Sequence, residues 1–146
     1  MFQKIILALS FCMLSLFAAS IEIKDSYVRA VPPSLPNSAS FMRILNNSDN
    51  TVQLVAANSD AALHVELHEH IMENGMMKMQ QISHIAIAPH SETILQPGGL
   101  HVMLLGLKKP LKAGDMVTIE LIFSNNETIT LHEVPVKSVM MGMQKK

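Results

Sequence analysis

Histidine and methionine gather in residues 64–103 of this 146-residue chain. The stretch holds six of the seven histidines and five of the twelve methionines. Imidazole nitrogen is a borderline donor and thioether sulfur is a soft one, and a mixed set without thiolate suits Cu(I) better than zinc, calcium or magnesium. The segment therefore predicts a metal site, and the rest of the chain must supply the elements that position it.

Three methionines and a histidine have, in two pairs, the spacing of residues that share one face of a strand. Side chains two positions apart point the same way in a strand. His101 and Met103 are such a pair, on an expected strand that follows the Pro-Gly-Gly sequence at 97–99. Met77 and Met79 form a second pair, so two strands each offer a pair of potential donors.

The strand before Met77 carries four polar residues on one face, namely His64, Glu66, His68 and His70. An Asn-Gly dipeptide follows at 74–75, and it is the strongest hairpin signal in the chain because both residues tolerate positive φ in a two-residue turn. A hairpin there would bring His68 or His70 back towards Met77 or Met79. These two pairs are candidates to converge with the strand that carries His101.

A single methionine in a β-sandwich usually fills the core, because the thioether packs flexibly into irregular gaps. We therefore expect Met42 and Met116, which stand alone in apolar runs, to be core residues. His84 and His90 border turns or strand ends, and we expect them in solvent. A strand face with three histidines and a glutamate cannot be ordinary core, which favours a site.

Short runs of alternating apolar and polar residues, separated by turn residues, predict strands along the chain from residue 21. The expected strands are 21–29, 39–45, 51–57, 63–70, 76–82, 84–88, 92–95, 101–107, 116–123 and 128–134. Many short strands at regular spacing predict an all-β fold, an antiparallel sandwich or small barrel with Greek-key connections.

The first 20 residues predict a secretory signal peptide, with Lys4, an apolar run from 5 to 17 and small residues up to Ser20. The apolar run is shorter than the roughly 20 residues that cross a bilayer, so we expect cleavage and no retained membrane span. A lipid anchor is the lesser alternative, because Cys12 follows Phe11, where a lipoprotein signal has a small residue. Cleavage leaves a domain from 21 to 135 and a flexible tail from 136 to 146.

Several function classes are excluded for the mature chain. Cys12, the only cysteine, leaves with the signal peptide, so thiolate chemistry and a blue-copper centre are excluded. Removal of Lys4 leaves ten basic and twelve acidic residues, a formal charge of −2, which does not suggest nucleic acid binding. The sequence HVELH at 64–68 only superficially resembles the zinc-hydrolase motif H-E-x-x-H, and we expect no enzyme.

The four residues His68, Met79, His101 and Met103 form the pattern H-x10-M-x21-H-x-M. This pattern resembles the signature of the PCuAC-type periplasmic copper chaperones. The surrounding segments are similar too: YVRAVPP at 27–33, AALHVELHE at 61–69, MKM at 77–79 and PGGLHVMLLGL at 97–107. The resemblance covers nearly the whole mature chain.

The resemblance implies a cupredoxin-like β-sandwich in the periplasm that binds one Cu(I) ion through His68, Met79, His101 and Met103. Family members are associated with copper supply to cytochrome c oxidase assembly, so the receiving partner would be an oxidase subunit or a Sco-type protein. We expect a monomer. The alternatives are a periplasmic copper-buffering or tolerance protein with the same ligands, and a β-sandwich interaction module without metal, which would leave the spacing unexplained.

This chain departs from the family pattern at two positions. His70 stands where many relatives have methionine, and Tyr27 stands where tryptophan is common. The first change adds a competing donor near the site, and the second is expected to alter packing only. The tail adds Met140, Met141 and Met143, which are candidates for a second copper site.

Overall fold

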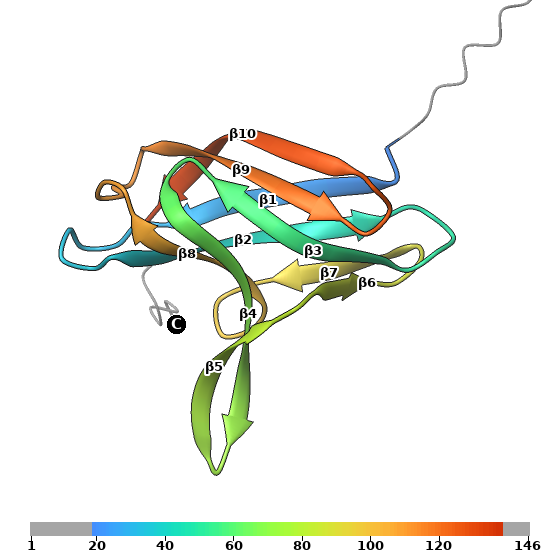
Figure 1. Cartoon of the computed structure of the whole chain (residues 1–146), viewed down its shortest axis with the longest axis horizontal. Coiled ribbons are helices and arrows are strands. Elements are labelled where there is room, and N and C mark those ends of the chain that lie inside the picture. Colours follow the sequence, from blue (N-terminus) through green and yellow to red (C-terminus); the bar gives the residue numbers. More distant parts are fainter. Residues whose placement is uncertain (1–18, 139–146) are drawn as a thin grey trace, which may run out of the picture.

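The computed structural model describes residues 19–138, which form ten strands and no helix (Figure 1). The strands are β1 (Ile21–Arg29), β2 (Asn37–Asn46), β3 (Val52–Ser59), β4 (Ala62–Glu73), β5 (Met76–Ile82), β6 (Ile85–Ile87), β7 (Ser91–Leu95), β8 (His101–Leu107), β9 (Met116–Phe123) and β10 (Thr128–Lys137). All ten expected strands are present, and the bounds of β1, β5, β8 and β9 agree with the prediction. In the described part of the chain, no helix is long and apolar enough to cross a membrane.

The strands form two layers. Hydrogen bonds join them in the order β5-β4-β8-β2-β1-β10-β9-β3-β6, and β7 pairs with β2 as well. Every pair is antiparallel except β1 with β10, where Val28 lies beside Val136. Neighbours that are distant in sequence, such as β2 and β8, show that the chain crosses between layers, as Greek-key connections require. The strand order does not close, so the fold is a sandwich and not a closed barrel.

The core lies between the layers and consists of aliphatic side chains. Its fully buried members include Ile44, Leu54, Ile87, Val102, Leu104, Ile119 and Leu121. Met42 is 2% exposed, which confirms its predicted place in the core. The prediction for Met116 is wrong, since it is 61% exposed. In β9 the odd-numbered residues from Val117 face the core, so alternation turns Met116 outward.

The hairpin of β4 and β5 projects from the body of the sandwich (Figure 1). Its turn residues Asn74 and Gly75 have φ values of 52° and 77°, which confirms the predicted two-residue turn. β5 stands at the end of the strand order and pairs only with β4. The predicted signal peptide up to residue 18 and the tail methionines lie outside the described residues.

Candidate metal centre

The histidines and methionines gather on the outer face of the layer that contains β2, β8, β4 and β5. In the register of β4 and β8, His68 lies opposite His101, and Glu66 lies opposite Met103. Directly opposed residues in antiparallel strands project to the same side of the sheet. The intervening residues, such as Leu67 and Val102, face the core. The site therefore lies on the face of this layer that is turned away from the core.

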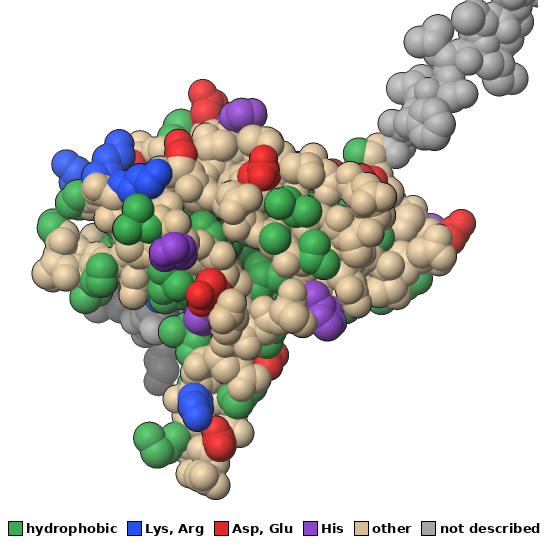
Figure 2. Space-filling view, viewed as in Figure 1, with side chains coloured by type: hydrophobic (Ala, Val, Ile, Leu, Met, Phe, Trp, Pro, Cys, Tyr) green, Lys and Arg blue, Asp and Glu red, His purple; other side chains and the backbone are tan. Residues whose placement is uncertain are grey.

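The projecting hairpin adds β5 to this face. His70 on β4 lies opposite Met79, and Met72 lies opposite Met77. The two-residue turn fixes this register, because residues 73 and 76 must face each other across it. Apolar side chains reach the surface along the hairpin (Figure 2). Met79 is 43% exposed and Met77 is 61% exposed, so β5 carries thioethers into solvent beside the histidines.

His101 is the most buried residue of the cluster, with 2% exposure. Its Nδ1 lies 3.1 Å from the carbonyl oxygen of Gly99. A carbonyl only accepts hydrogen bonds, so Nδ1 carries the proton and donates it, which leaves Nε2 with a free lone pair. That Nε2 lies 3.1 Å from the Sδ of Met79. Two lone-pair donors thus face each other without a hydrogen between them.

The electrostatics keep this imidazole neutral. Burial lowers the pKa of His101 below its usual value, and the nearby side chains of His70, His68 and Arg29 lower it further, whereas the hydrogen bond to Gly99 acts in the opposite direction. A neutral imidazole is the form that binds metal. The Nε2 of His101 is therefore available to a metal ion near neutral pH.

His68 is oriented by a neighbouring carboxylate. Its Nε2 lies 2.7 Å from the Oε2 of Glu66, which accepts a hydrogen bond from the ring. Its Nδ1 is buried and has no hydrogen-bond partner. Metal-bound histidines commonly donate their second ring N–H to a carboxylate, which fixes the ring and the tautomer. The His68 ring centroid lies 5.7 Å from that of His101.

His70 has an equally available nitrogen. Its Nδ1 is buried without a hydrogen-bond partner, and its ring centroid lies 5.2 Å from that of His101. His70 also lines a pocket of about 520 Å³ together with Met77, Met79, His101 and Met103, whereas His68 does not. The structure thus brings the four signature residues to one face and adds His70, at the position that departs from the family pattern.

Thioethers lie beside the imidazoles of this cluster. Within residues 19–138, no three histidine, cysteine, aspartate or glutamate side chains converge in a group that could hold a metal ion. The thioethers of Met77, Met79 and Met103 line the pocket beside His101, and soft sulfur favours Cu(I) over zinc.

Comparison with known proteins identifies the family. Residues 21–136 match the family model described as "Putative lipoprotein LpqE-like". The chain belongs to the LpqE-like family. It is 36% identical over 121 residues to a "Putative lipoprotein" of Leifsonia xyli subsp. xyli, which covers 82% of this chain and 71% of that protein. It is 31% identical over 97 residues to an uncharacterised protein of Rickettsia prowazekii, covering 66% and 54% of the two chains. The lipoprotein description supports an extracytoplasmic location.

Solved structures have the same fold as this LpqE-like chain. The copper-bound PCuAC domain from PmoF2 is 22% identical, with a TM-score of 0.69 over 82% of this chain and 94% of that one. Apo-DR1885 from Deinococcus radiodurans is 33% identical, with a TM-score of 0.64 over 86% and 84%. The Cu(I) form of DR1885 has a TM-score of 0.60 at 33% identity, over 80% and 75%. The cupredoxin-like fold implied by the sequence is confirmed, and these neighbours support membership of the PCuAC family.

Aromatic residues that the sequence reasoning did not assign to the site support it in this LpqE-like chain. Phe41 on β2 packs beside His101, with ring centroids 6.2 Å apart. Tyr27 on β1 packs on Phe41, with ring centroids 5.3 Å apart. The guanidinium of Arg29 lies 5.3 Å from the centroid of the Phe41 ring. The pairing of Tyr27 with Phe41 across β1 and β2 brings these residues together, and no local sequence signal reveals it.

The remaining histidines of the stretch lie away from the cluster. His84 and His90 are exposed, as predicted. His84 contacts the hydroxyl of Ser83, and His90 contacts Asp49. His64 is on the same face of β4 as His68, but it is exposed and lies opposite Leu105. None of the three lines the pocket of His101.

Proposed function

We propose that this chain is a periplasmic copper chaperone that binds one Cu(I) ion and supplies it for cytochrome c oxidase assembly. The ligands in this proposal are His68, Met79, His101 and Met103. The receiving partner is an oxidase subunit or a Sco-type protein. The protein binds and transfers its cargo and catalyses no reaction.

One observation carries the proposal. The Nε2 of His101 and the Sδ of Met79 lie 3.1 Å apart, while the other nitrogen of His101 donates to Gly99. Two unprotonated donors at this distance repel each other unless a cation lies against both. The pair combines one imidazole with one thioether, which is the donor mixture that favours Cu(I).

The ligand chemistry supports a carrier. Two imidazoles and two thioethers are neutral, so bound Cu(I) keeps its positive charge and is not neutralised as it is by thiolates. This favours exchange with a partner over permanent storage. Thioethers also suit an oxidising compartment, because methionine forms no disulfide. The lipoprotein description of the family agrees with that compartment.

The binding site is tested by competition between the mature protein and a coloured Cu(I) chelator. We expect one Cu(I) ion per chain and an X-ray absorption spectrum that contains both nitrogen and sulfur donors. A spectrum with only nitrogen and oxygen donors would remove Met79 and Met103 from the site. A stoichiometry of two would indicate a second site, and a chain that ends at Lys137 would then assign it to the tail methionines or exclude them.

The cellular role is tested with a strain that lacks the protein. If the chain supplies copper to the oxidase, oxidase activity falls under limiting copper and is restored by added copper. Normal oxidase activity together with sensitivity to excess copper would instead support the buffering and tolerance role. A chain that binds no copper at all would leave the β-sandwich interaction module as the function.

A further inference from the structure

β4 and its two neighbours, β8 and β5, carry three successive pairs of metal donors along one face. His68 on β4 lies opposite His101 on β8, His70 lies opposite Met79, and Met72 lies opposite Met77. Along β4 these residues are two apart, so neighbouring pairs are separated by roughly 7 Å. The pairs run from the buried body of the sandwich to the exposed end of the hairpin.

Resting on the proposed Cu(I) site, we propose that these pairs form an exit path on which Cu(I) passes by ligand exchange from His68 to His70 and then to Met72 and Met77. In each step one copper–ligand bond forms as another breaks: His70 replaces His68, Met77 and Met72 then replace His101 and Met103, and donors of the partner replace the remaining ligands. The oxidation state of copper and the protonation of the ligands do not change. A partner would receive the ion at the end of the hairpin.

His70 has the features that an exchange ligand needs. Its buried Nδ1 has no hydrogen-bond partner, so binding copper there requires no other bond to break. His68, by contrast, is held by Glu66 at 2.7 Å. His70 lines the pocket and His68 does not. The exchange therefore moves copper from His68, which is hydrogen-bonded to Glu66, to His70 in the pocket wall.

The two histidines bind in turn and not together. Their rings lie 5.7 Å and 5.2 Å from that of His101, so each is within reach of an ion at His101. In the described part of the chain, however, the histidines do not converge in a group of three that could hold a metal ion. Alternative occupancy of one coordination position accounts for both facts.

The path ends at exposed side chains with soft sulfur donors. Met72 is 67% exposed and Met77 is 61% exposed, and they face each other across the hairpin. Adjacent exposed apolar side chains form a patch of the kind that marks an interaction site. Thioethers there bind Cu(I) weakly enough to release it. This is the property that the last position before a partner requires.

The test compares the transfer rate with the affinity. Mature protein loaded with Cu(I) is mixed with excess chelator in a stopped-flow instrument, and the dissociation constant is measured separately by competition. In the double variant Met72→Leu, Met77→Leu, we expect transfer to be roughly tenfold slower with little change in affinity. Leucine keeps the volume and removes the sulfur. The matched control is Met76→Leu, because Met76 is 72% exposed but alternates to the other face of the hairpin.

His70 gives a second test. His70→Ala should slow transfer at least as much and leave most of the affinity, and His70→Met should restore the rate because it returns a soft donor to the position. Unchanged rates in both His70→Ala and the double methionine variant would overturn the path. Loss of binding in His70→Ala would overturn the exchange, since His70 would then be a permanent ligand. A different result would contradict the proposed function itself: His101→Ala that still binds copper at full affinity.

Discussion

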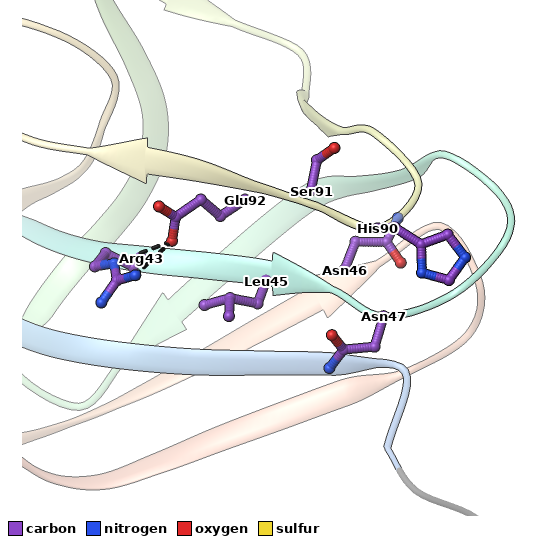
Figure 3. Close-up of a pocket in the computed structure, with 7 residues that line it drawn as sticks. All are labelled: Arg43, Leu45, Asn46, Asn47, His90, Ser91 and Glu92. Carbon is purple, nitrogen blue, oxygen red and sulfur yellow. Dashed lines mark hydrogen bonds and ion pairs between the residues drawn. The ribbon is translucent and has the colours of Figure 1, made fainter.

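Histidines line two pockets on this sandwich, and the pockets differ in whether the ring nitrogens have hydrogen-bond partners. At the far end of β2, a pocket is lined by Arg43, Asn46, His90 and Glu92 among others (Figure 3). There, His90 Nε2 lies 2.6 Å from Asp49, and Arg43 pairs with Glu92 at 2.8 Å. Around His101, two neighbouring imidazoles keep buried nitrogens without partners, and the other donors are thioethers.

The difference shows what turns histidine into a metal ligand. In the far pocket the side chains already have partners, because Arg43 pairs with Glu92 and His90 contacts Asp49. Around His101, the Nδ1 atoms of His68 and His70 are buried and have no hydrogen-bond partner. Buried polar groups without partners cost free energy, and a metal ion that binds them offsets this cost. Four substitutions test this contrast, and they are given in order of decreasing effect.

The largest effect is expected from His101→Ala. It removes the imidazole that faces Met79, and loss of a direct ligand should exceed the tenfold to 100-fold typical of residues that only orient a ligand. We therefore expect Cu(I) affinity to fall by more than roughly 100-fold. The matched substitution His90→Ala in the far pocket should leave affinity unchanged. Chelator competition measures the Cu(I) affinity of both variants. Equal losses of affinity would contradict the assignment of the copper site to the pocket of His101.

Glu66→Gln should have an intermediate effect. The amide keeps the size of the side chain but is a weaker acceptor for the Nε2 of His68, so the ring is held less firmly. We expect Cu(I) affinity to fall roughly tenfold. Glu92→Gln is the control, because it removes a carboxylate from the far pocket. An unchanged affinity in Glu66→Gln would show that His68 needs no orientation or is not a ligand.

A smaller effect is expected from Gly75→Ala. The φ of Gly75 is 77°, a value that strains an alanine although its Cβ would meet no atom within 4 Å. The turn should be destabilised by about 1 kcal/mol, with a several-fold loss of Cu(I) affinity because Met79 depends on the hairpin. Gly114→Ala is the control, since its φ is 96° and its Cβ is equally unobstructed. Thermal unfolding should show a similar loss of stability in both variants, whereas copper binding should be weaker only in Gly75→Ala.

The smallest effect is expected from Arg43→Met. It breaks the exposed ion pairs with Glu92 and Asp25, whose contribution is screened by salt. We expect a slight loss of stability at low ionic strength that disappears in high salt, and no change in copper binding. Urea unfolding at two salt concentrations measures it. A change in copper affinity would mean that the two ends of the sheet are coupled.

Local pattern was enough to predict the strands and the hairpin. Alternation located all ten strands, and the Asn-Gly turn was recognised from its backbone requirements. The sequence reasoning left open whether His68 or His70 faces Met77 or Met79. The turn itself contains the answer, because a two-residue loop at 74–75 places His70 opposite Met79. The failed prediction for Met116 has a similar origin, since the position of the alternation within β9 depends on which residues pack against the other layer.

Contacts between distant segments could not be predicted from the sequence. The pairing of His68 with His101 depends on which strand lies beside β4, and the packing of Phe41 against His101 depends on a third strand. The proton on Nδ1 of His101 depends on the carbonyl of Gly99. The assignment of four ligands rested on the family spacing, and it remains a prediction that the variants above can test.

The position of β5 at the end of the strand order has a consequence for the motions of the protein. Edge strands open locally at a lower free energy than the interior of a sheet. An ion shared by Met79 on β5 and His101 on β8 would cross-link the fraying edge to the rigid interior, and it would stabilise only the closed form. Amide hydrogen exchange in β5 should therefore slow when Cu(I) binds, while exchange in β9 stays the same. Bound copper would then be detected as reduced local opening of the β4–β5 hairpin alone.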